Sequence, residues 1–403
     1  MLKGKRIILG VTGGIAAYKS AALASMLIKA GAHVDVIMTE NACKMISPVT
    51  FEAITKTCAV TDTFDRAHSF EIEHISLAEG ADFAVIAPAT ANIIAKLANG
   101  ICDDMLSTTM LACRAKKLIV PAMNTNMYEN PIQQENLARL ESYGFLTEGP
   151  QCGRLACGAV GAGKMSEPEQ IFERIVQETA FAKDLTGKKI IVTAGPTCEA
   201  IDPVRYITNH SSGKMGYALA VAAARRGAEV VLISGKTALE KPRFMKVINV
   251  VSAADMYDAV MCETTGADAL IMAAAVADYT PSEPADQKIK KQSGVPEIRL
   301  SRTKDIIKSV SERGDRHLLL CGFSMETQNV EENSRKKLES KGLDMICANS
   351  LRQDGAGFGV NTNILKIITP FEELDTGLVT KDEAAHRVLD EVKKGMERKI
   401  GQC

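Results

Sequence analysis

The sequence of 403 residues lacks the features of a membrane or nucleic-acid-binding protein. The longest uninterrupted apolar run, Ala269–Ala277, is far shorter than the roughly 20 residues that span a bilayer. The formal net charge is −1, so the chain has no excess of positive charge for nucleic acid or an anionic membrane. We therefore expect partners that are small molecules, with no nucleic acid and no membrane among them.

Paired cysteines are also lacking. The 11 cysteines are odd in number and scattered, and no two of them form C-x-x-C. This pattern fits a reducing cytosol better than a disulfide framework. The first residues enter a strand-like apolar run directly, without the layout of a signal peptide. We expect a soluble, cytoplasmic protein.

A full dinucleotide fingerprint, G-x-G-x-x-G, is missing as well, although the chain starts twice in the manner of a nucleotide-binding fold. The run GKRIILGVTGG (4–14) leads through a helical stretch to GAHVDVIMT (31–39). The run GKKIIVTAGP (187–196) leads to GAEVVLISG (227–235). Each is a strand, a glycine turn, a helix and a second strand, which is the unit of parallel sheets. A glycine turn of this kind either binds an anion such as a mononucleotide phosphate or only packs.

Further short apolar runs complete the predicted fold, α/β with two Rossmann-like domains, each a mostly parallel sheet covered by helices. They read as buried parallel strands: FAVIAPA, KLIVPAM, ALIMAAA, LLLCGFS, LDMICAN and ILKIIT. The stretches 216–227 and 380–396 read as helices. A change of pattern near 181–189 predicts domain one at 1–183 and domain two at 184–403.

The stretch CGRLACGAVGAGKM (152–165) resembles the phosphate loop of an NTPase but lacks its hydroxyl. Met165 stands where a Ser or Thr should hold Mg²⁺. Cys152 and Cys157 are not followed by a second pair, and no His lies nearby, so a metal site is disfavoured. What remains is a glycine-rich flap with one or two thiols, or a plain surface loop.

Several stretches taken together resemble two known families. In the first domain they are GVTGGIAAYK, EHISLAEGADFAVIAPATAN, PAMNTNMYENP and CGRLACGAVGAGKM, which resemble the flavin-dependent cysteine decarboxylases. In the second domain they are TAGPTCEAIDPVRYITNHSSGKMG, AAAVADYTP with KIKK, and GFSMET, which resemble phosphopantothenate–cysteine ligases. The order of the halves is similar to that of the bacterial bifunctional coenzyme A biosynthesis proteins. The ordered set is far more specific than any one motif.

For the first domain the resemblance implies FMN-dependent decarboxylation of phosphopantothenoylcysteine to 4′-phosphopantetheine. His74 matches the active-site histidine, with substrate deprotonation or positioning as its role. Asn124 matches the residue that holds the substrate carboxylate, and Cys157 matches the proton donor of the reductive step. A thiol with a reference pKa of about 8.5 is mostly protonated near neutrality and can donate. On residues alone, a lone histidine such as His74 is more often structural than catalytic, and the alternative for Asn124 is a turn amide.

Other residues of the first domain match the family's binding positions. They are Gly13, Gly14 and Thr39 at the FMN phosphate, Ser107, Thr108 and Ala122 along the flavin, and Met123 and Lys164 on the substrate side. Many relatives have Arg at the position of Lys164. Lysine keeps the positive charge but loses the bidentate grip on a carboxylate or phosphate.

For the second domain the resemblance implies joining of 4′-phosphopantothenate to cysteine. The family uses CTP and forms an acyl-cytidylate that the cysteine amine attacks, with Mg²⁺ expected on the triphosphate. Asn209 matches a contact to the acyl intermediate, and Lys288 opens the basic run KIKK, which is otherwise a solvated face or a nucleic-acid patch. The nucleotide side is expected to involve Ala273, Ala274, Ala275, Asp278, Lys304, Asp305, Ile306, Ile307, Phe323, Lys337 and Lys341.

Two other functions compete with this one, besides a nicotinamide dehydrogenase, against which the missing G-x-G-x-x-G speaks. One is a related peptidyl-cysteine decarboxylase or flavin prenyltransferase fused to an unrelated nucleotide-binding domain. The other is a flavin-binding regulatory subunit without activity, which should lack His74 or Cys157, whereas both are present. The resemblance also implies a homo-oligomer of trimeric decarboxylase units and dimeric ligase units, up to a dodecamer. The metal ligands are not indicated by the sequence.

Overall fold

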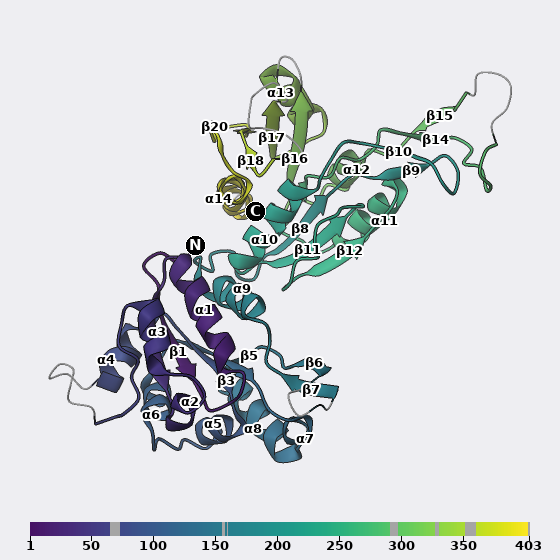
Figure 1. Ribbon diagram of the computed structural model, residues 1–403. Coiled ribbons are helices and arrows are strands. Elements are labelled where there is room, and N and C mark those ends of the chain that lie inside the picture. The colour runs from purple at the N-terminus through teal and green to yellow at the C-terminus, as the bar shows by residue number, and fades with distance from the viewer. Residues whose placement is uncertain are drawn as a thin grey trace. The chain divides into compact units, whose positions relative to one another are not determined.

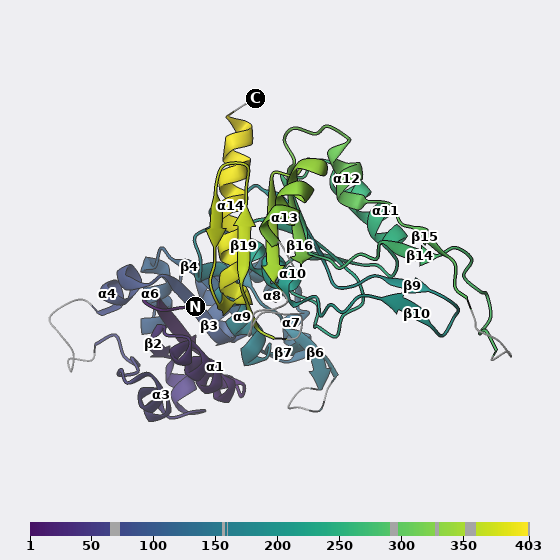
Figure 2. The same cartoon turned by 90° about the horizontal axis from the view of Figure 1, so that it is seen from above.

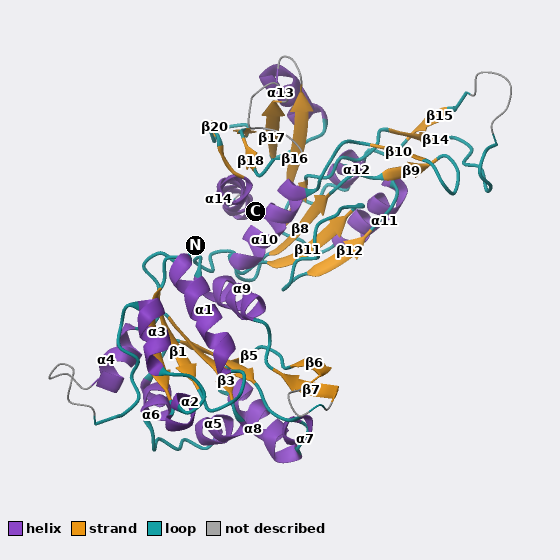
Figure 3. Cartoon of the chain, in the orientation of Figure 1, coloured by secondary structure: helices purple, strands orange, loops and turns teal. Residues whose placement is uncertain are grey.

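The computed structural model of the chain describes residues 1–64, 73–154, 158, 160–290, 297–326, 330–350 and 360–401. The fold divides into two units, Met1–Phe181 and Ala182–Cys403. In each unit a mostly parallel sheet lies between layers of helices (Figure 3). This architecture confirms the predicted α/β class with two Rossmann-like domains. Within the described ranges, no helix combines the length and the apolar character needed to cross a membrane.

The first unit is built on five parallel strands in the order β2-β1-β3-β4-β5 (Figure 1). Its strands are β1 (Arg6–Val11), β2 (His33–Met38), β3 (Phe83–Ala89), β4 (Lys116–Pro121), β5 (Leu146–Thr147), β6 (Gln151–Arg154) and β7 (Val160–Lys164). Its helices are α1 (Ala17–Lys29), α2 (Glu40–Cys43), α3 (Pro48–Thr55), α4 (Glu73–Gly80), α5 (Ala91–Ala98), α6 (Met105–Ala112), α7 (Thr125–Tyr128), α8 (Pro131–Ser142) and α9 (Pro168–Thr179).

Both faces of this sheet are covered. Residues of α1, α3 and α9 pack on one face, and residues of α4, α5, α6 and α8 pack on the other. Every residue of β3 is therefore buried, which explains why its sequence is continuously apolar. Strand order reverses around β1, so the turns after β1, β2 and β3 meet at one edge of the sheet, where α/β folds bind ligands.

The glycine-rich stretch at 152–165 does not form a strand-to-helix phosphate loop. Its described residues form the antiparallel hairpin of β6 and β7, in which Cys152 pairs with Ala162 and Gly153 with Gly161. We call this hairpin of β6 and β7 the flap. Leu155–Cys157 and Ala159 lie outside the described residues.

The second unit contains an eight-stranded sheet in the order β12-β11-β8-β13-β16-β17-β19-β20. Its strands are β8 (Lys189–Ala194), β9 (Cys198–Ala200), β10 (Tyr206–Thr208), β11 (Glu229–Ser234), β12 (Lys246–Asn249), β13 (Ala269–Met272), β14 (Tyr279–Pro281), β15 (Leu300–Arg302), β16 (Leu319–Glu326), β17 (Met345–Ser350), β18 (Thr362–Asn363), β19 (Leu365–Ile368), β20 (Glu373–Asp375) and β21 (Val379–Thr380). Its helices are α10 (Lys214–Arg225), α11 (Ala253–Glu263), α12 (Ile306–Ser311), α13 (Val330–Ser340) and α14 (Lys381–Ile400).

One predicted strand runs in the unexpected direction. The run ILKIIT forms β19, but β19 pairs antiparallel with β17 and β20 rather than parallel. The prediction of a parallel strand was wrong because an apolar run reports burial on both faces and carries no information on direction.

Helices cover both faces of the second sheet too. Residues of α10 and α14 pack on one face, while residues of α11, α12 and α13 pack on the other. The hairpins β9–β10 and β14–β15 lie side by side and extend away from the sheet (Figures 1 and 2). The strand order again reverses beside β8, so the carboxyl ends of β8, β13 and β16 form the edge at which a ligand is expected.

Candidate active sites

Two neighbouring cavities open at the carboxyl edge of the first sheet, with volumes of about 780 and 570 Å³. The larger one is mainly apolar and is lined by Gly13, Gly14, Ile15, Ala16, Tyr18, Lys19, Thr90, Ala91, Ala122, Met123, Asn124, Met127, Arg154, Gly163, Lys164 and Met165. The smaller one is polar and is lined by Thr12, Gly13, Thr39, Glu40, Asn41, Thr90, Ala91, Asn92, Ile93, Lys96, Asp103, Asp104 and Met127. The fold thus brings together seven predicted residues: Gly13, Gly14, Thr39, Ala122, Met123, Asn124 and Lys164.

The glycine turn after β1 forms the boundary between these cavities. A Cβ atom on Gly13 would lie 2.4 Å from the Cβ atom of Asn41, so only glycine allows the turns after β1 and β2 to approach this closely. The Thr12 hydroxyl donates to the carbonyl of Pro88 at 2.7 Å, and the amide of Thr90 donates to the Thr12 hydroxyl at 3.2 Å. The three turns are therefore held together as one rigid edge.

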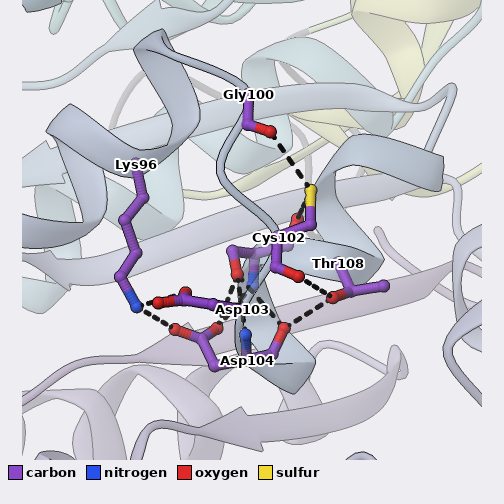
Figure 4. A network of polar contacts seen from close by, with 7 residues as sticks. Lys96, Gly100, Cys102, Asp103, Asp104 and Thr108 are labelled. Atoms are coloured by element: carbon purple, nitrogen blue, oxygen red, sulfur yellow. Dashed lines mark hydrogen bonds and ion pairs between the residues drawn. The ribbon is translucent and has the colours of Figure 1, made fainter.

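Ser107 and Thr108 take part in a polar network instead of lining a cavity (Figure 4). Asp104 caps α6, and its Oδ1 accepts hydrogen bonds from the amide of Ser107 at 2.8 Å and from its hydroxyl at 2.9 Å. The Ser107 residue is completely buried, and the Thr108 hydroxyl donates to the carbonyl of Asp104 at 2.8 Å. Neither side chain lines either of the two cavities, and their contact with the flavin stays a prediction.

The same network fixes the charge of the polar cavity. Lys96 Nζ lies 2.6 Å from Asp103 Oδ1 and 2.7 Å from Asp104 Oδ2. Burial acts to raise the pKa of Asp104, but the hydrogen bonds from Lys96 and Ser107 outweigh burial, so this pKa lies below its usual value. Two carboxylates therefore face one ammonium, and this corner disfavours an anion. A phosphate group fits the Gly13–Gly14 side of the cavity better.

Asn124 lies where a loop meets the flap. Its Oδ1 accepts a hydrogen bond from the amide of Asn126 at 2.9 Å, so the residue caps the short helix α7. The amide of the preceding residue, Met123, donates to the carbonyl of Gly163 in β7 at 3.0 Å. Asn124 therefore caps a turn and lines the cavity at the same time, so the two alternative roles predicted from the sequence do not exclude each other.

Lys164, at the end of β7, is paired with a carboxylate. Its Nζ lies 2.8 Å from Glu167 Oε1, and Lys19 Nζ lies 2.9 Å from Glu167 Oε2. Hydrogen bonds from Lys164 and then Lys19 lower the pKa of Glu167. Two ammonium groups thus share one carboxylate at the cavity wall, which leaves a net positive charge there for a substrate anion.

Of the other two predicted catalytic residues of this unit, only His74 is described, and the fold does not bring it into the cavity of Asn124. His74 is half-buried on α4 and lines neither cavity. Cys157 lies outside the described residues. Sequence reasoning missed Tyr18, Lys19 and Arg154 as cavity residues, although all three lie within motifs that were singled out.

A cavity of about 510 Å³ lies at the carboxyl edge of the second sheet. Its lining includes nine of the predicted residues: Ala274, Asp278, Lys304, Asp305, Ile306, Ile307, Phe323, Lys337 and Lys341. They come from four segments that are far apart in the sequence. Ala273 and Ala275 flank Ala274 in the loop after β13, while Asn209 and Lys288 do not line this cavity.

Buried threonine hydroxyls hold the loop after β13 in place. The amide of Ala274 donates to the Thr193 hydroxyl at 3.1 Å, and the amide of Ala277 donates to the Thr197 hydroxyl at 3.0 Å. The Thr303 hydroxyl donates to the carbonyl of Ala277 at 2.7 Å. Because these bonds fix the backbone, the loop offers a preformed surface to a ligand.

Asn209 is attached to the same loop from its outer side. Its Nδ2 donates to the carbonyls of Ala275 and Val276, both at 3.2 Å. The residue is exposed, and it joins the segment after β10 to the wall of the cavity. Asn209 is therefore adjacent to the nucleotide-side residues although it does not line the cavity.

Lysine side chains give the second cavity a positive character. Lys304 Nζ lies 4.5 Å from the centre of the Tyr257 ring, and Lys341 Nζ lies 3.0 Å from Asp305 Oδ2. Asp305 also caps α12. With Lys337 and Arg302 in the lining, three ammonium groups and one guanidinium group face two carboxylates, Asp278 being the second. This balance favours an anionic ligand.

Lys288 lies on the exposed segment between β14 and β15. The amide of the next residue, Ile289, donates to Asp202 Oδ2 at 3.1 Å, and its carbonyl accepts from Arg205 Nη2 at 3.0 Å. Arg205 also holds the pKa of the buried Asp202 well below its usual range. The backbone beside Lys288 is thereby tied to the β9–β10 hairpin, while the lysine itself is exposed.

The described ranges contain no group of three His, Cys, Asp or Glu side chains arranged to hold a metal ion. Two carboxylates, Asp278 and Asp305, line the second cavity, and Asp305 is paired with Lys341. A protein-built metal centre is therefore not present in this part of the chain.

Residues 1–180 match the family described as Flavoprotein, and residues 185–396 match the DNA/pantothenate metabolism flavoprotein C-terminal domain. The Coenzyme A biosynthesis bifunctional protein CoaBC of Bacillus subtilis is 47% identical over 398 residues, which cover 97% of each chain. The chain belongs to this family. Its counterpart in Escherichia coli K12 is 42% identical over 394 residues, again covering 97% of each chain.

Solved structures resemble one half of the chain at a time. A crystal structure of the C-terminal domain of a CoaBC protein is 42% identical and covers 54% of this chain and 100% of its own, with a TM-score of 0.47. A PPC decarboxylase mutant complexed with pantothenoylaminoethenethiol is 28% identical and covers 42% of this chain and 96% of its own, with a TM-score of 0.39.

Membership of the bifunctional coenzyme A biosynthesis family confirms the predicted two-step role, in which a ligase half and a flavoprotein decarboxylase half act in coenzyme A biosynthesis. It also excludes the alternative of a flavoprotein fused to an unrelated nucleotide-binding domain, because the family match of the second half extends over residues 185–396.

Proposed function

We propose that the second unit ligates 4′-phosphopantothenate to cysteine with CTP, and that the first unit decarboxylates the product with FMN. The observation that carries the proposal is the cavity at the carboxyl edge of the second sheet, in which nine of the predicted residues converge from four distant segments. Its size of about 510 Å³ and its positive lining suit a nucleotide. The chain then makes phosphopantothenoylcysteine and converts it to 4′-phosphopantetheine.

In the ligase, the chain's residues supply charge and placement. Lys304, Lys337 and Lys341 attract the triphosphate, and the fixed backbone at 273–278 offers amides and carbonyls to the base. Asn209 steadies the acyl-cytidylate, and Lys288 approaches it from the exposed segment while cysteine attacks. Because the described residues hold no ready cluster of metal ligands, Mg²⁺ would be carried mainly by the phosphate oxygens.

In the decarboxylase, the first cavity accommodates FMN. Its apolar part can hold a ring system, and the Gly13–Gly14 turn with Thr39 can hold the phosphate without meeting the Asp103–Asp104 corner. When bound, FMN supplies the oxidation of the substrate's cysteine end and the hydride that is returned to it. Asn124 orients the substrate carboxylate, since a neutral amide avoids an ionic stabilisation that would oppose loss of CO₂. Cys157 donates the proton in the reductive step.

His74 fits this scheme only if a second copy of the chain takes part. It lies on α4, outside the cavity that contains Asn124. Delivery of His74 from a neighbouring copy would complete the site, in keeping with trimeric decarboxylase units. We propose further that the ligase units are dimers and that the full assembly is a dodecamer. We also propose a cytoplasmic location.

The experiment begins with the visible spectrum of the purified protein after reconstitution with FMN. The protein is then given 4′-phosphopantothenate and cysteine with either CTP or ATP, and phosphopantothenoylcysteine, CO₂ and 4′-phosphopantetheine are measured. Retained FMN and product formation with CTP support the proposal. A colourless protein would overturn the decarboxylase part, and turnover with ATP but not with CTP would overturn the nucleotide.

A further inference from the structure

The flap hairpin rests directly on the loop that carries Asn124. Besides the hydrogen bond from the Met123 amide to the Gly163 carbonyl, the backbones are in close contact. Gly163 has φ +145°, and a Cβ atom there would lie 2.3 Å from the carbonyl oxygen of Met123. Strand β7 therefore lies so close to residues 123–125 that a movement of one displaces the other.

Two glycines face each other across the hairpin but have different surroundings. Gly153 in β6 pairs in register with Gly161 in β7. A Cβ atom on Gly161 would lie 2.7 Å from both Oγ1 and Cγ2 of Thr125, whereas on Gly153 it would meet only Lys164 Cδ at 3.7 Å. Neither glycine has a positive φ, so backbone strain does not distinguish them. The difference between them is the contact with Thr125.

The Thr125 side chain fills this contact by its shape. Its hydroxyl is buried and has no hydrogen-bond partner among the residues that the structure describes. A buried hydroxyl without a partner costs folding free energy instead of adding to it, so the shape of the side chain, and not its hydrogen bonding, is what this position uses. Thr125 follows Asn124 directly and starts α7, the helix that Asn124 caps.

We propose that Thr125 is a positioning residue of the decarboxylase. Its branched side chain sets the separation between β7 and the 123–125 loop, and thereby the position of Asn124 relative to the flap that carries Cys157. The proposal rests on the decarboxylase function proposed above. A misplacement of about 1 Å at a reacting group can reduce turnover by about 100-fold, so a spacer at this point affects catalysis and not only folding.

The test uses the full chain loaded with FMN and compares kcat and KM for phosphopantothenoylcysteine in five variants. Gly161→Ala forces a methyl group against Thr125, and Gly153→Ala is its matched control. Thr125→Ala removes the spacer, Thr125→Val keeps its shape without the hydroxyl, and the double variant Gly161→Ala/Thr125→Ala makes room for the added methyl group.

We expect Gly161→Ala to lower kcat by about 10- to 100-fold, given the cost of a misplaced group. Thr125→Ala should lower kcat less, and the double variant should recover part of what Gly161→Ala loses. Gly153→Ala and Thr125→Val should stay within about threefold of the wild type, since a change of 0.5 kcal/mol corresponds to a little over twofold.

A second readout does not depend on activity. Hydrogen exchange of the peptide containing the Met123 amide should become faster in Gly161→Ala and stay unchanged in Gly153→Ala, because that amide bonds to Gly163. Equal effects of the two glycine variants on both readouts would overturn the proposal, and so would a Thr125→Val variant as impaired as Thr125→Ala, since the hydroxyl would then be the active group. A wild type without decarboxylase activity would refute the proposed function instead, and the exchange experiment would still test the contact.

Discussion

The two sites differ in how much of each a single unit contains. In the second unit, nine predicted residues converge on one cavity. The loop beside it is fixed by hydrogen bonds that Thr193 and Thr197 accept and Thr303 donates. In the first unit, Asn124 and Lys164 reach the cavity while His74 lies on α4, away from it. The proposed nucleotide pocket is thus formed by one sheet edge, whereas the proposed decarboxylase residues are distributed over a loop, a flap and a separate helix.

This difference between the two sites is consistent with the structural requirements of the two reactions. Binding a nucleotide needs a preformed, positively charged surface, which the ends of parallel strands supply. A redox decarboxylation also needs water excluded around a reactive thiol, which the proposed contributions of the flap and of a second copy of the chain would supply. The first site should therefore respond more strongly to changes in the flap and the assembly, and the second to changes in its own loop.

Replacing Cys157 with Ser should have the largest effect. An alcohol is a far weaker acid than a thiol, so loss of the proton donor should slow formation of 4′-phosphopantetheine by about 10²- to 10⁴-fold. The first oxidation should continue, leaving reduced flavin and released CO₂, which absorbance and headspace analysis measure in one reaction. Normal turnover would remove Cys157 from the mechanism and return the flap to a plain surface loop.

Lys288→Gln and Asn209→Asp should act on the other site, at its second half-reaction. We expect phosphopantothenoyl-cytidylate to accumulate, because attack by cysteine slows while its formation continues. The variants are mixed with CTP and 4′-phosphopantothenate and then chased with cysteine. Quenched-flow mass spectrometry measures the formation of the intermediate and its consumption by cysteine.

Lys290→Gln is the matched control, since Lys290 lies in the same exposed basic run. It should change neither step, in line with the usual surface effect of within about 0.5 kcal/mol. If the intermediate in Lys288→Gln or Asn209→Asp decays at the wild-type rate, that residue has no role in the attack.

Mixing two inactive decarboxylase variants tests whether the first site is shared between copies. His74→Asn and Asn124→Asp should each be nearly inactive alone. After exchange of subunits, sites that combine an intact His74 with an intact Asn124 from another copy should restore roughly a quarter of the activity, the statistical share in a symmetric oligomer. Refolding the variants together provides the exchange, and assays at matched total protein give the recovery. No recovery despite mixed oligomers would mean that both residues act from one chain.

Thr197→Val should have the smallest effect and should be confined to the second unit. Thr197 is completely buried, and its loss leaves the amide of Ala277 without its partner, at a cost of about 1–3 kcal/mol in unfolding free energy. KM for CTP should rise while decarboxylation is unchanged.

Thr264→Val is the control for Thr197→Val. The Thr264 hydroxyl donates to the carbonyl of Val260, and that carbonyl also accepts a hydrogen bond from the Thr264 amide. Its removal leaves no backbone amide unpaired, and the cost should be smaller. Equal denaturation midpoints and equal KM values in the two variants would show that the loop does not depend on the Thr197 bond.

The strands were largely predictable from the sequence because buried parallel strands are continuously apolar. The runs that became β3, β4, β13, β16 and β17 lie where they were expected. The direction of β19 was not predictable, because burial on both faces gives the same pattern in either orientation. The short hairpins β9–β10 and β14–β15 were missed, since strands of three residues are too short to show a period.

Cavity residues could be predicted from motifs where the fold brings those motifs to one sheet edge. Ala274, Lys304 and Phe323 are examples. A sequence motif does not distinguish a residue that lines a cavity from one that supports the neighbours of that residue. Ser107 illustrates this, because a serine three residues after an aspartate serves equally as a helix cap and as a ligand contact. Thr125 had no sequence signal, since its role depends on a glycine 36 positions later.

Cutting the chain into residues 1–183 and 184–403 tests the central claim, that each unit carries its own activity. The fragments are assayed separately after circular dichroism shows that each is folded. We predict that 184–403 forms phosphopantothenoylcysteine and pyrophosphate from CTP, and that 1–183 with FMN releases CO₂ from phosphopantothenoylcysteine. A folded fragment that is inactive alone and regains activity only when the other is added would contradict the claim.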